Sequence, residues 1–347
     1  MIEQGRGTLY TTRLCYLCPG GEIGRHARLK ILSLLGGAGS TPAPGTRSFM
    51  HMTSQSKAFA FAIATLLLWS SVATAFKITL RYLDIFQLLF YACVTSVVLL
   101  LSIIIIQKKV LQLFAAMRRH WKITMIAGFL NPCLYYLVLF EAYDRLPAQV
   151  AQPINITWAI TLTFMSIIFL KQKITMADIA GALICYGGVV IIATQGDLSG
   201  FASSDLIGVG LALFSTIIWA GYWILNIRDP REPTIGMTLN FMVALPITAI
   251  VCALFSDFSI PREGILGAIY TGLFEMSVAF LCWSMALRLT DNTSRISNLI
   301  FLIPFISLVF ISQVLGEVIY STTYIGLIFI IGGLVYQQWS HTTANTN

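Results

Sequence analysis

The feature that most constrains the fold is a succession of apolar segments, each long enough to cross a lipid bilayer. Between residues 57 and 339, predominantly apolar stretches of about 19–23 residues alternate with mostly short polar connections. An α-helix needs about 20 such residues to span about 30 Å of hydrocarbon. We therefore predict ten transmembrane helices, at 58–77, 86–106, 123–142, 148–170, 177–195, 206–226, 235–256, 264–286, 292–314 and 321–339.

The composition excludes a water-soluble fold. Hydrophobic residues make up 57% of the chain and charged residues only 11%, whereas soluble domains carry about 25% charged residues. The net charge is +7, but the basic residues lie between the apolar segments. They form no continuous basic face with aromatic readers, so we expect no nucleic-acid partner.

The distribution of Lys and Arg predicts the orientation in the membrane. Twelve basic residues fall on one side of the predicted helices and four on the other. The larger set is Lys57, Lys108, Lys109, Arg118, Arg119, Lys122, Lys171, Lys173, Arg228, Arg231, Arg288 and Arg295; the smaller set is Lys77, Arg81, Arg145 and Arg262. Because cytoplasmic connections carry the excess of positive charge, both termini are expected in the cytoplasm. We expect a multi-pass protein of the cytoplasmic (inner or plasma) membrane.

One connection is long, at residues 108–122, and it alternates basic with apolar side chains. This pattern is typical of a short amphipathic helix that lies in the headgroup region. A plain cytoplasmic anchor is the simpler interpretation, and a lipid-sensing role is the alternative.

The chain ends differ from the membrane part. Residues 1–56 are rich in Gly, Arg and Pro at first and lack sustained periodicity, so we predict a disordered tail; alternatively, translation starts natively at Met50 or Met52. Residues 341–347 form a short C-terminal tail. Cys15 and Cys18 make an isolated C-x-x-C without a second pair, which is a weak metal signal. We expect no metal and no cofactor.

Two halves of the membrane part repeat each other, which predicts domains at 57–196 and 197–340. Glycines at 181, 187 and 188 recur at 326, 332 and 333, and Arg145-Leu146 recurs as Arg288-Leu289. Because each half has five helices, the second must enter the membrane from the opposite side. The predicted fold class is therefore an all-α integral membrane protein of ten transmembrane helices in two inverted five-helix repeats. Secondary transporters use such repeats for alternating access around a midplane site.

Two local patterns predict structure rather than chemistry. Thr175 and Asp178 have the spacing of a capping box before the fifth helix. The glycine faces at 181–188 and 326–333 allow close contact between helices.

The stretch ALRLTDNTSRISNLIFLIPFISLVFISQVLGEVIYSTTYIGLIFIIGG carries a family resemblance. Small polar residues open a helix, Pro304 lies at its centre, Gly316-Glu317 closes it, and a glycine-rich helix follows. This arrangement resembles the EamA module of the drug/metabolite transporter superfamily, over residues 57–339. The first half departs from the pattern, since Thr161 replaces the proline and Gln172 the glutamate. The resemblance implies a secondary transporter, usually an exporter of amino acids or other metabolites, with a cavity lined by helices 3, 4, 8 and 9.

Glu275 is the candidate for chemistry because it falls near the middle of the eighth predicted helix. Ionisable groups at that depth are costly and mark function by default. A midplane carboxyl is expected to be neutral unless it is paired, so it could bind a substrate amine or carry a coupling proton. The alternative is a protonated side chain that only fixes helix packing. Asn131 or Tyr135 of the third helix is the expected partner.

Two further sets complete the predicted site. The polar triplet Gln149, Gln152 and Asn155 matches Asn292, Arg295 and Asn298 in the other half, and each triplet is expected to line one vestibule. Aromatic residues near mid-helix could hold a planar or cationic substrate, or could simply pack. The candidate substrate-binding residues are Glu275, Asn131, Tyr135, Gln152, Asn155, Trp158, Trp219, Trp223, Trp283, Arg295 and Asn298.

The remaining function classes are less favoured. All four histidines lie outside the predicted helices, which argues against a metalloenzyme or a Ser–His enzyme at membrane depth. We expect no enzyme, but a secondary active exporter of small metabolites. An uptake carrier is the alternative within transport, and a non-transporting structural or receptor protein is the alternative outside it. The expected partners are a small-molecule substrate, the bilayer and, if Glu275 titrates, a coupling proton. The oligomeric state is left open, with a monomer as the simplest expectation.

Overall fold

The computed structural model is a bundle of helices. It describes residues 54–171, 174–194, 205–259, 261–290, 296 and 298–344. Within these ranges the chain forms helices and connections and no strand. Residues 1–53 of the predicted N-terminal tail and the last three residues lie outside the described residues, and residues 54–56 begin the first helix.

The first half of the chain contributes the helices up to Thr194. They are α1 (Ser54–Thr79), α2 (Ile85–Ile106), α3 (Val110–Arg119), α4 (Trp121–Gly128), the π-helical η1 (Phe129–Leu134), α5 (Tyr135–Arg145), α6 (Ala148–Ile156), α7 (Trp158–Leu170) and α8 (Met176–Thr194).

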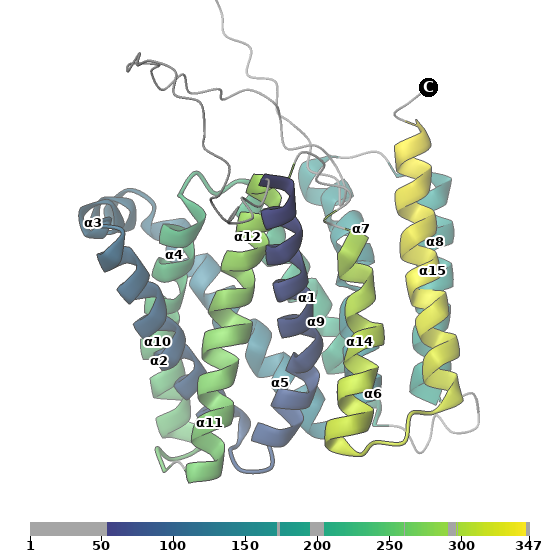
Figure 1. Cartoon of the computed structure of the whole chain (residues 1–347), viewed down its shortest axis with the longest axis horizontal. Helices are drawn as coiled ribbons and strands as arrows, with labels where there is room; N and C mark the ends of the chain where they lie inside the picture. The colour runs from purple at the N-terminus through teal and green to yellow at the C-terminus, as the bar shows by residue number, and fades with distance from the viewer. Residues whose placement is uncertain are drawn as a thin grey trace, which may run out of the picture.

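The second half begins at α9. Its helices are α9 (Leu206–Ile227), α10 (Pro233–Phe255), α11 (Arg262–Tyr270), the π-helical η3 (Thr271–Val278), α12 (Ala279–Leu289), the 3₁₀ segment η4 (Asn298–Leu302), α14 (Ile303–Phe310), the π-helical η5 (Ile311–Leu315) and α15 (Ser321–Ala344). The start of α1 and the end of α15 lie at the same end of the bundle (Figure 1).

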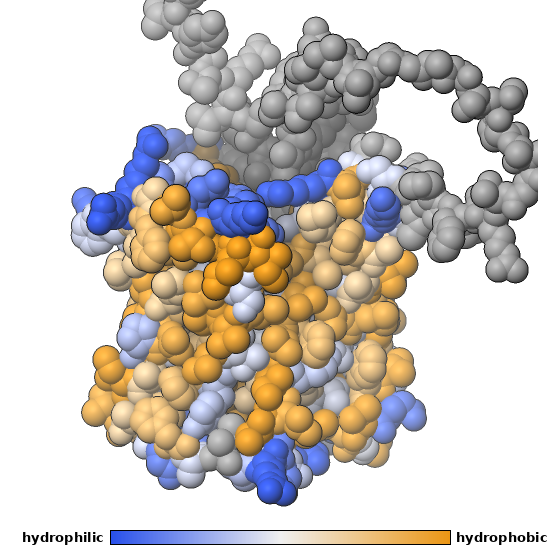
Figure 2. All heavy atoms as spheres, turned by 60° about the vertical axis from the view of Figure 1, so that its left-hand side comes forward, coloured by the Kyte–Doolittle hydropathy of each residue, from blue (hydrophilic) through white to orange (hydrophobic). Residues whose placement is uncertain are grey.

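Eight stretches of the described chain are long and apolar enough to cross a membrane. They are 54–79, 85–106, 121–145, 148–170, 176–194, 206–227, 233–255 and 262–289, and their ends lie within four residues of the first eight predicted spans. The last two predicted spans correspond to shorter apolar helices, at 299–315 and 321–337. The protein is therefore a multi-pass, all-helical membrane protein, and its flank carries the apolar belt that this requires (Figure 2).

Local sequence signals explain where several helices begin. Asp84 caps α2 in a capping box with Gln87, and Pro233 occupies the first turn of α10, where no N–H is needed. The predicted capping box is confirmed: the Asp178 amide donates to Thr175 Oγ1 at 3.2 Å and the Thr175 amide donates to Asp178 Oδ2 at 2.8 Å. These caps satisfy amide groups that lack partners within a helix.

The glycine faces pack against each other, as α8 and α15 lie side by side (Figure 1). A β-carbon on Gly181 would lie 2.9 Å from the carbonyl oxygen of Gly333. At the other end of the contact, Gly188 meets Gly326 in the same way. The predicted close approach is confirmed, and the two faces prove to be partners.

The amphipathic helix predicted in the long connection is also confirmed, as α3. Its Leu113 is buried in a cluster with Ile104 of α2 and with Ile235 and Leu239 of α10. In Figure 1 α3 is seen end-on, whereas the neighbouring helices run vertically. Its axis therefore lies across the bundle at the end where α1 starts.

Candidate functional site

Two irregular helices meet where Tyr136 contacts Glu275. Tyr136 is the second residue of α5, which follows η1 within the membrane-crossing stretch 121–145, and Glu275 lies inside η3, within 262–289. The Tyr136 hydroxyl donates a hydrogen bond of 3.1 Å to Glu275 Oε1. The expected partner, Asn131 or Tyr135, was thus predicted on the right helix but at the wrong residue.

The irregularity of η1 follows from its sequence. Pro132 has no N–H to donate to the preceding turn, and a proline disfavours helical geometry in the residue before it. Accordingly, Asn131 has φ −143° and ψ 120°, outside the helical region. The helix therefore changes register between Asn131 and Tyr135, and this change decides which tyrosine faces Glu275.

In η3 the carbonyl oxygen of Gly272 is held by hydroxyl groups. It accepts hydrogen bonds from Ser96 Oγ at 2.9 Å and from Ser277 Oγ at 3.0 Å. Ser277 is therefore engaged by the backbone and makes no hydrogen bond to the nearby Glu275 within the described chain. A π-helical turn of this kind is frequent at functional sites.

One oxygen of the Glu275 carboxyl accepts a hydrogen bond, and the other has no hydrogen-bond partner among the described residues. The residue is only 9% exposed, and Oε2 is buried without a hydrogen-bond partner among the described residues. Asn131 Oδ1 and Trp223 Nε1 are buried and unpartnered in the same sense. Buried polar atoms are nearly always hydrogen-bonded. A bound molecule, a water or a proton would therefore be expected to provide the missing partners of these atoms.

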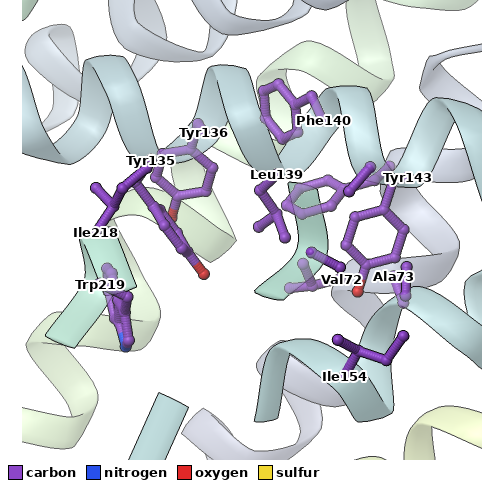
Figure 3. Close-up of a cluster of buried hydrophobic side chains, with 14 of the residues drawn as sticks. Val72, Ala73, Tyr135, Tyr136, Leu139, Phe140, Tyr143, Ile154, Ile218 and Trp219 are labelled. Carbon is purple, nitrogen blue, oxygen red and sulfur yellow. The ribbon is translucent and has the colours of Figure 1, made fainter. Parts of the chain in front are cut away.

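Aromatic rings continue from Glu275 as one connected wall. Tyr135 stacks on Trp219 with ring centroids 4.6 Å apart and an interplanar angle of 28°. Tyr135, Tyr136 and Trp219 lie next to one another in Figure 3, at one end of a cluster that continues to Phe140 and Tyr143. The rings come from α5 and α9, so the wall is built by both halves of the chain.

The wall extends in two directions from Trp219. Toward α1 and α12 the rings follow one another from Trp219 to Phe280, Trp69 and Trp283. The distances between successive ring centroids are 5.7, 5.5 and 5.8 Å. Toward α7, Trp223 lies 6.0 Å from Trp219 and stacks on Trp158 at 6.3 Å with an interplanar angle of 15°. All five predicted aromatic site residues therefore belong to one network.

The three residues of the predicted polar triplet, Gln149, Gln152 and Asn155, hydrogen-bond to three different parts of the structure. Gln152 Oε1 accepts from the Tyr143 hydroxyl at 2.7 Å, and Asn155 Nδ2 donates to Ser215 Oγ at 3.0 Å. Gln149 is buried and bonds to the segment after η5, so the triplet does not line a vestibule as one face. Arg295 lies outside the described residues, as does the side chain of Asn298, whose backbone begins η4.

A polar network marks the end of the bundle near α3. The Arg231 side chain is 0% exposed and forms an ion pair with Asp229, with Nη2 to Oδ2 at 2.6 Å. It also donates to Thr124 Oγ1 at 2.7 Å and to Asn240 Oδ1 at 3.1 Å. The network ties α4, the connection before α10, and α10 together, so Arg231 is not the free loop charge that its position suggested.

A second network marks the opposite end. The Glu317 carboxylate accepts hydrogen bonds from the backbone amides of Ala148 and Gln149, at 3.1 and 3.4 Å. A negative charge therefore lies at the start of α6, where the helix dipole favours it. Gln149 in turn donates to the Val318 carbonyl at 2.9 Å. The Gly316-Glu317 motif therefore ends one helix and caps another.

The Glu275 carboxyl and the tyrosine that it contacts are buried in the described structure. Tyr136 is fully buried, and the networks of Arg231 and of Glu317 join helices at either end. An open groove of about 470 Å³ lies instead between α7 and α8; it is lined by apolar side chains such as Phe164, Leu183 and Val190 and by none of the candidate site residues.

The arrangement is suited to the reversible binding of a cation or a proton. A buried carboxyl beside electron-rich ring faces can hold an ammonium group or a proton. Among the described residues no cluster of His, Cys, Asp and Glu has the geometry for a metal ion. The five described cysteines are free, and four of them are buried.

Comparison with known families agrees with this geometry. A model of the EamA-like transporter family matches the chain twice, at residues 56–194 and 206–336. The chain belongs to the EamA-like transporter family. The two matches cover the helices from α1 to α8 and from α9 into α15.

Relatives of this EamA-like transporter are named as transporters. A protein of Archaeoglobus fulgidus, named as an uncharacterized transporter, is 25% identical over 80% of this chain and 96% of its own length. A protein of Ancylobacter novellus, named as the aromatic amino acid exporter YddG, is 23% identical over 51% of this chain and 62% of its own length. A solved crystal structure has a TM-score of 0.59 at 20% identity, over 81% of this chain and 96% of the other. These names indicate a transporter rather than an enzyme.

Three residues of this EamA-like transporter contribute to the site although the sequence did not predict them. Tyr136 is one of the aromatic residues near mid-helix but is not among the predicted site residues, because a regular helix gives no reason to prefer it to Tyr135. Phe280 lies five residues after Glu275, which in a regular helix would turn it away. Glu317 was noted only as part of the family motif, and its contact with α6 spans 169 positions in the chain.

Proposed function

We propose that this EamA-like transporter is a secondary active exporter of amino acids or related small metabolites. The single observation that carries the proposal is the Glu275 carboxyl, which is buried with Oε2 unpartnered beside the aromatic wall. A substrate amine would satisfy that oxygen, and the rings would hold an apolar or planar part of the same molecule. The name of the relative from Ancylobacter novellus is consistent with an aromatic substrate.

The proposed architecture is ten transmembrane helices in two inverted halves. Two family matches of similar length support two repeats. The glycine contacts also support them: an offset of 145 converts the pair Gly181–Gly333 into the pair Gly326–Gly188, as a pseudo-two-fold axis would. Irregular segments occur in both halves, at 129–134 and 271–278. Inverted repeats allow one site to open alternately to either side.

We place both termini in the cytoplasm of a cell whose cytoplasmic membrane holds the protein. The support is the excess of Lys and Arg in the connections at the end of the bundle where α1 starts. Export is favoured over uptake by the relative named as an exporter.

The substrate and the direction are tested together by metabolite analysis. Cells that overexpress the protein and cells that lack it are grown side by side, and amino acids in the medium are quantified. Export predicts more of one amino acid outside the overexpressing cells and less outside the deletion strain. The opposite pattern would indicate uptake, and an unchanged medium together with unchanged cell contents would contradict amino-acid transport.

The site is tested with the identified substrate in proteoliposomes. Glu275→Gln keeps the size of the side chain and removes its titratable proton. If Glu275 carries a coupling proton, the variant loses the pH dependence of transport; if it binds a substrate amine, apparent affinity falls at every pH. Glu263→Gln is the matched control, because Glu263 is an exposed carboxylate on the same membrane-crossing stretch. Wild-type rate, affinity and pH profile in Glu275→Gln would overturn the assignment.

A further inference from the structure

Helix α3 is fixed to the bundle by one face only. Leu113 is buried against Ile104, Ile235 and Leu239, and Lys109 at the start of the helix pairs with Glu232 at 2.6 Å. These contacts hold α3 across the end of the bundle (Figure 1). The opposite face is left without a protein partner in the described structure.

That free face carries large apolar side chains. Leu111 is 84% exposed and Phe114 is 61% exposed. The two positions are about 60° apart around a regular helix, so they form one strip. Trp121, just beyond the helix, is exposed as well. Apolar side chains this exposed would be unfavourable in water, and they are favourable where the hydrocarbon of a bilayer begins.

The same region carries unpaired positive charge. Lys108, Arg118, Arg119 and Lys122 are exposed, and none of them forms an ion pair with any residue that the structure describes. The sequence holds no Asp or Glu between Asp84 and Glu141 that could neutralise them. Arg118 follows Phe114 by four residues and so lies on the strip of Leu111 and Phe114.

At the opposite end of the bundle, none of the connections that the structure describes forms a helix. The connection from α10 to α11, residues 256–261, is six residues long; it contains Asp257 and no Lys or Arg. In Figure 2 hydrophilic residues line the upper rim directly above the apolar flank, and others lie along the lower rim. Among the described connections, a helix with both a basic edge and an exposed apolar strip therefore lies at the α3 end.

We propose that α3 and the residues flanking it bind the headgroups of anionic phospholipids in that leaflet. Leu111 and Phe114 enter the acyl region, while Arg118, Arg119 and Lys122 contact lipid phosphates. Charge complementarity selects this occupant, because the surface is purely basic and lies at the edge of the apolar belt. Clusters of four or more Lys and Arg on an amphipathic helix are the usual features of such binding. The proposal does not depend on the transported substrate.

The test measures lipid binding to the purified protein in a neutral detergent. Phosphatidylglycerol and phosphatidylcholine are titrated separately, and bound lipids are counted by native mass spectrometry while the melting temperature is recorded. Wild-type protein should retain phosphatidylglycerol in preference to phosphatidylcholine. Arg118→Gln/Arg119→Gln should lower the affinity for phosphatidylglycerol by about 10- to 30-fold, since each cation near an anionic surface contributes about fivefold. About 1 M salt should have a similar effect, because the Debye length is then about 3 Å.

The matched control is Arg81→Gln/Arg262→Gln, which removes the same charge from exposed positions in the smaller basic set. It should bind phosphatidylglycerol as the wild type does. Equal losses in both variants would show a general effect of net charge and overturn the proposal, as would an unchanged affinity in Arg118→Gln/Arg119→Gln. Displacement of the lipid by millimolar inorganic phosphate would indicate a small-anion site instead. If the arginine variant misfolds, Leu111→Ala/Phe114→Ala tests the apolar strip, and wild-type lipid retention in it would contradict the proposal.

Discussion

Gly188 and Gly326 touch backbone to backbone across two helices. A β-carbon on Gly188 would lie 2.4 Å from the carbonyl oxygen of Gly326, and one on Gly326 would lie 2.6 Å from the carbonyl oxygen of Gly188. Real β-carbons do not approach oxygen atoms this closely, so any side chain here forces α8 and α15 apart. The contact joins one helix from each half of the chain.

Gly188→Ala should therefore destabilise the protein by about 1–3 kcal/mol, the usual cost of overpacking. Unfolding in detergent, followed by helical circular dichroism, measures the change. The adjacent substitution Gly187→Ala is the control, because no atom lies within 4 Å of its added β-carbon. It should be neutral or should stabilise by up to about 1 kcal/mol, since alanine favours the helix over glycine. Equal effects of the two substitutions would show that the close contact is not formed.

The hydrogen bond from Tyr136 to Glu275 should be detectable as a coupling energy. Tyr136→Phe removes the donor to Glu275 Oε1, and Glu275→Met removes the acceptor. In a double-mutant cycle on unfolding free energy, the two should couple by about 0.5–3 kcal/mol. Tyr135→Phe paired with Glu275→Met is the comparison, because the Tyr135 hydroxyl makes no hydrogen bond to Glu275 within the described chain. Stronger coupling for Tyr135 than for Tyr136 would contradict the observed pairing.

Arg231 should contribute far more to stability than Lys109, which forms a partly exposed ion pair. Arg231→Met leaves Asp229 with an uncompensated charge in a buried network, and breaking such a pair costs about 3–5 kcal/mol. Lys109→Met breaks the Lys109–Glu232 pair, whose side chains are 27% and 29% exposed. That change should cost about 1 kcal/mol or less, because solvent screens the pair. Chemical unfolding of both variants compares the two, and similar losses would show that Arg231 is hydrated.

The orientation predicts which positions a membrane-impermeant thiol reagent can reach in intact cells. A cysteine at Gln112, at the α3 end, should be labelled only after permeabilisation, whereas one at Ser259 should be labelled from outside. Pro230 should behave like Gln112, and Gly200, which lies outside the described residues, should behave like Ser259. The unsubstituted protein gives the background from its own cysteines. Labelling of the cysteine at Gln112 in intact cells would reverse the proposed orientation.

The sequence predicts the parts of the fold that hydrophobic periodicity and local capping determine, namely the membrane-crossing segments and the starts of helices. Segment lengths located the eight membrane-length stretches, and the Thr175–Asp178 spacing located the start of α8. The glycine faces were visible as well, because close helix contact requires small residues whatever the partner. Trp158, Trp219 and Trp223 were grouped correctly, since mid-helix aromatic residues in one bundle tend to meet.

The sequence could not predict which side chains meet across an irregular helix. The break at Asn131 changes the register, so Tyr136 rather than Tyr135 reaches Glu275. The burial of Arg231 also escaped, because its three partners come from α4, α10 and its own connection. Gln149 was expected in a vestibule, but Glu317, far away in the chain, holds it.

The π-helical turn at Thr271–Val278 sets where this helix can change in length. In a regular α-helix each residue advances the chain by about 100°, so a residue gained or lost within α12 before Trp283 would turn Trp283 away from Trp69 although every aromatic residue would still be present. A π-helical turn closes with one more residue than an α-helical turn. A residue lost from Thr271–Val278 would therefore let that turn close as a regular α-helix, and Phe280 and Trp283 would keep facing Trp69. Lineages can lose a residue here without changing the surface presented to the transported molecule.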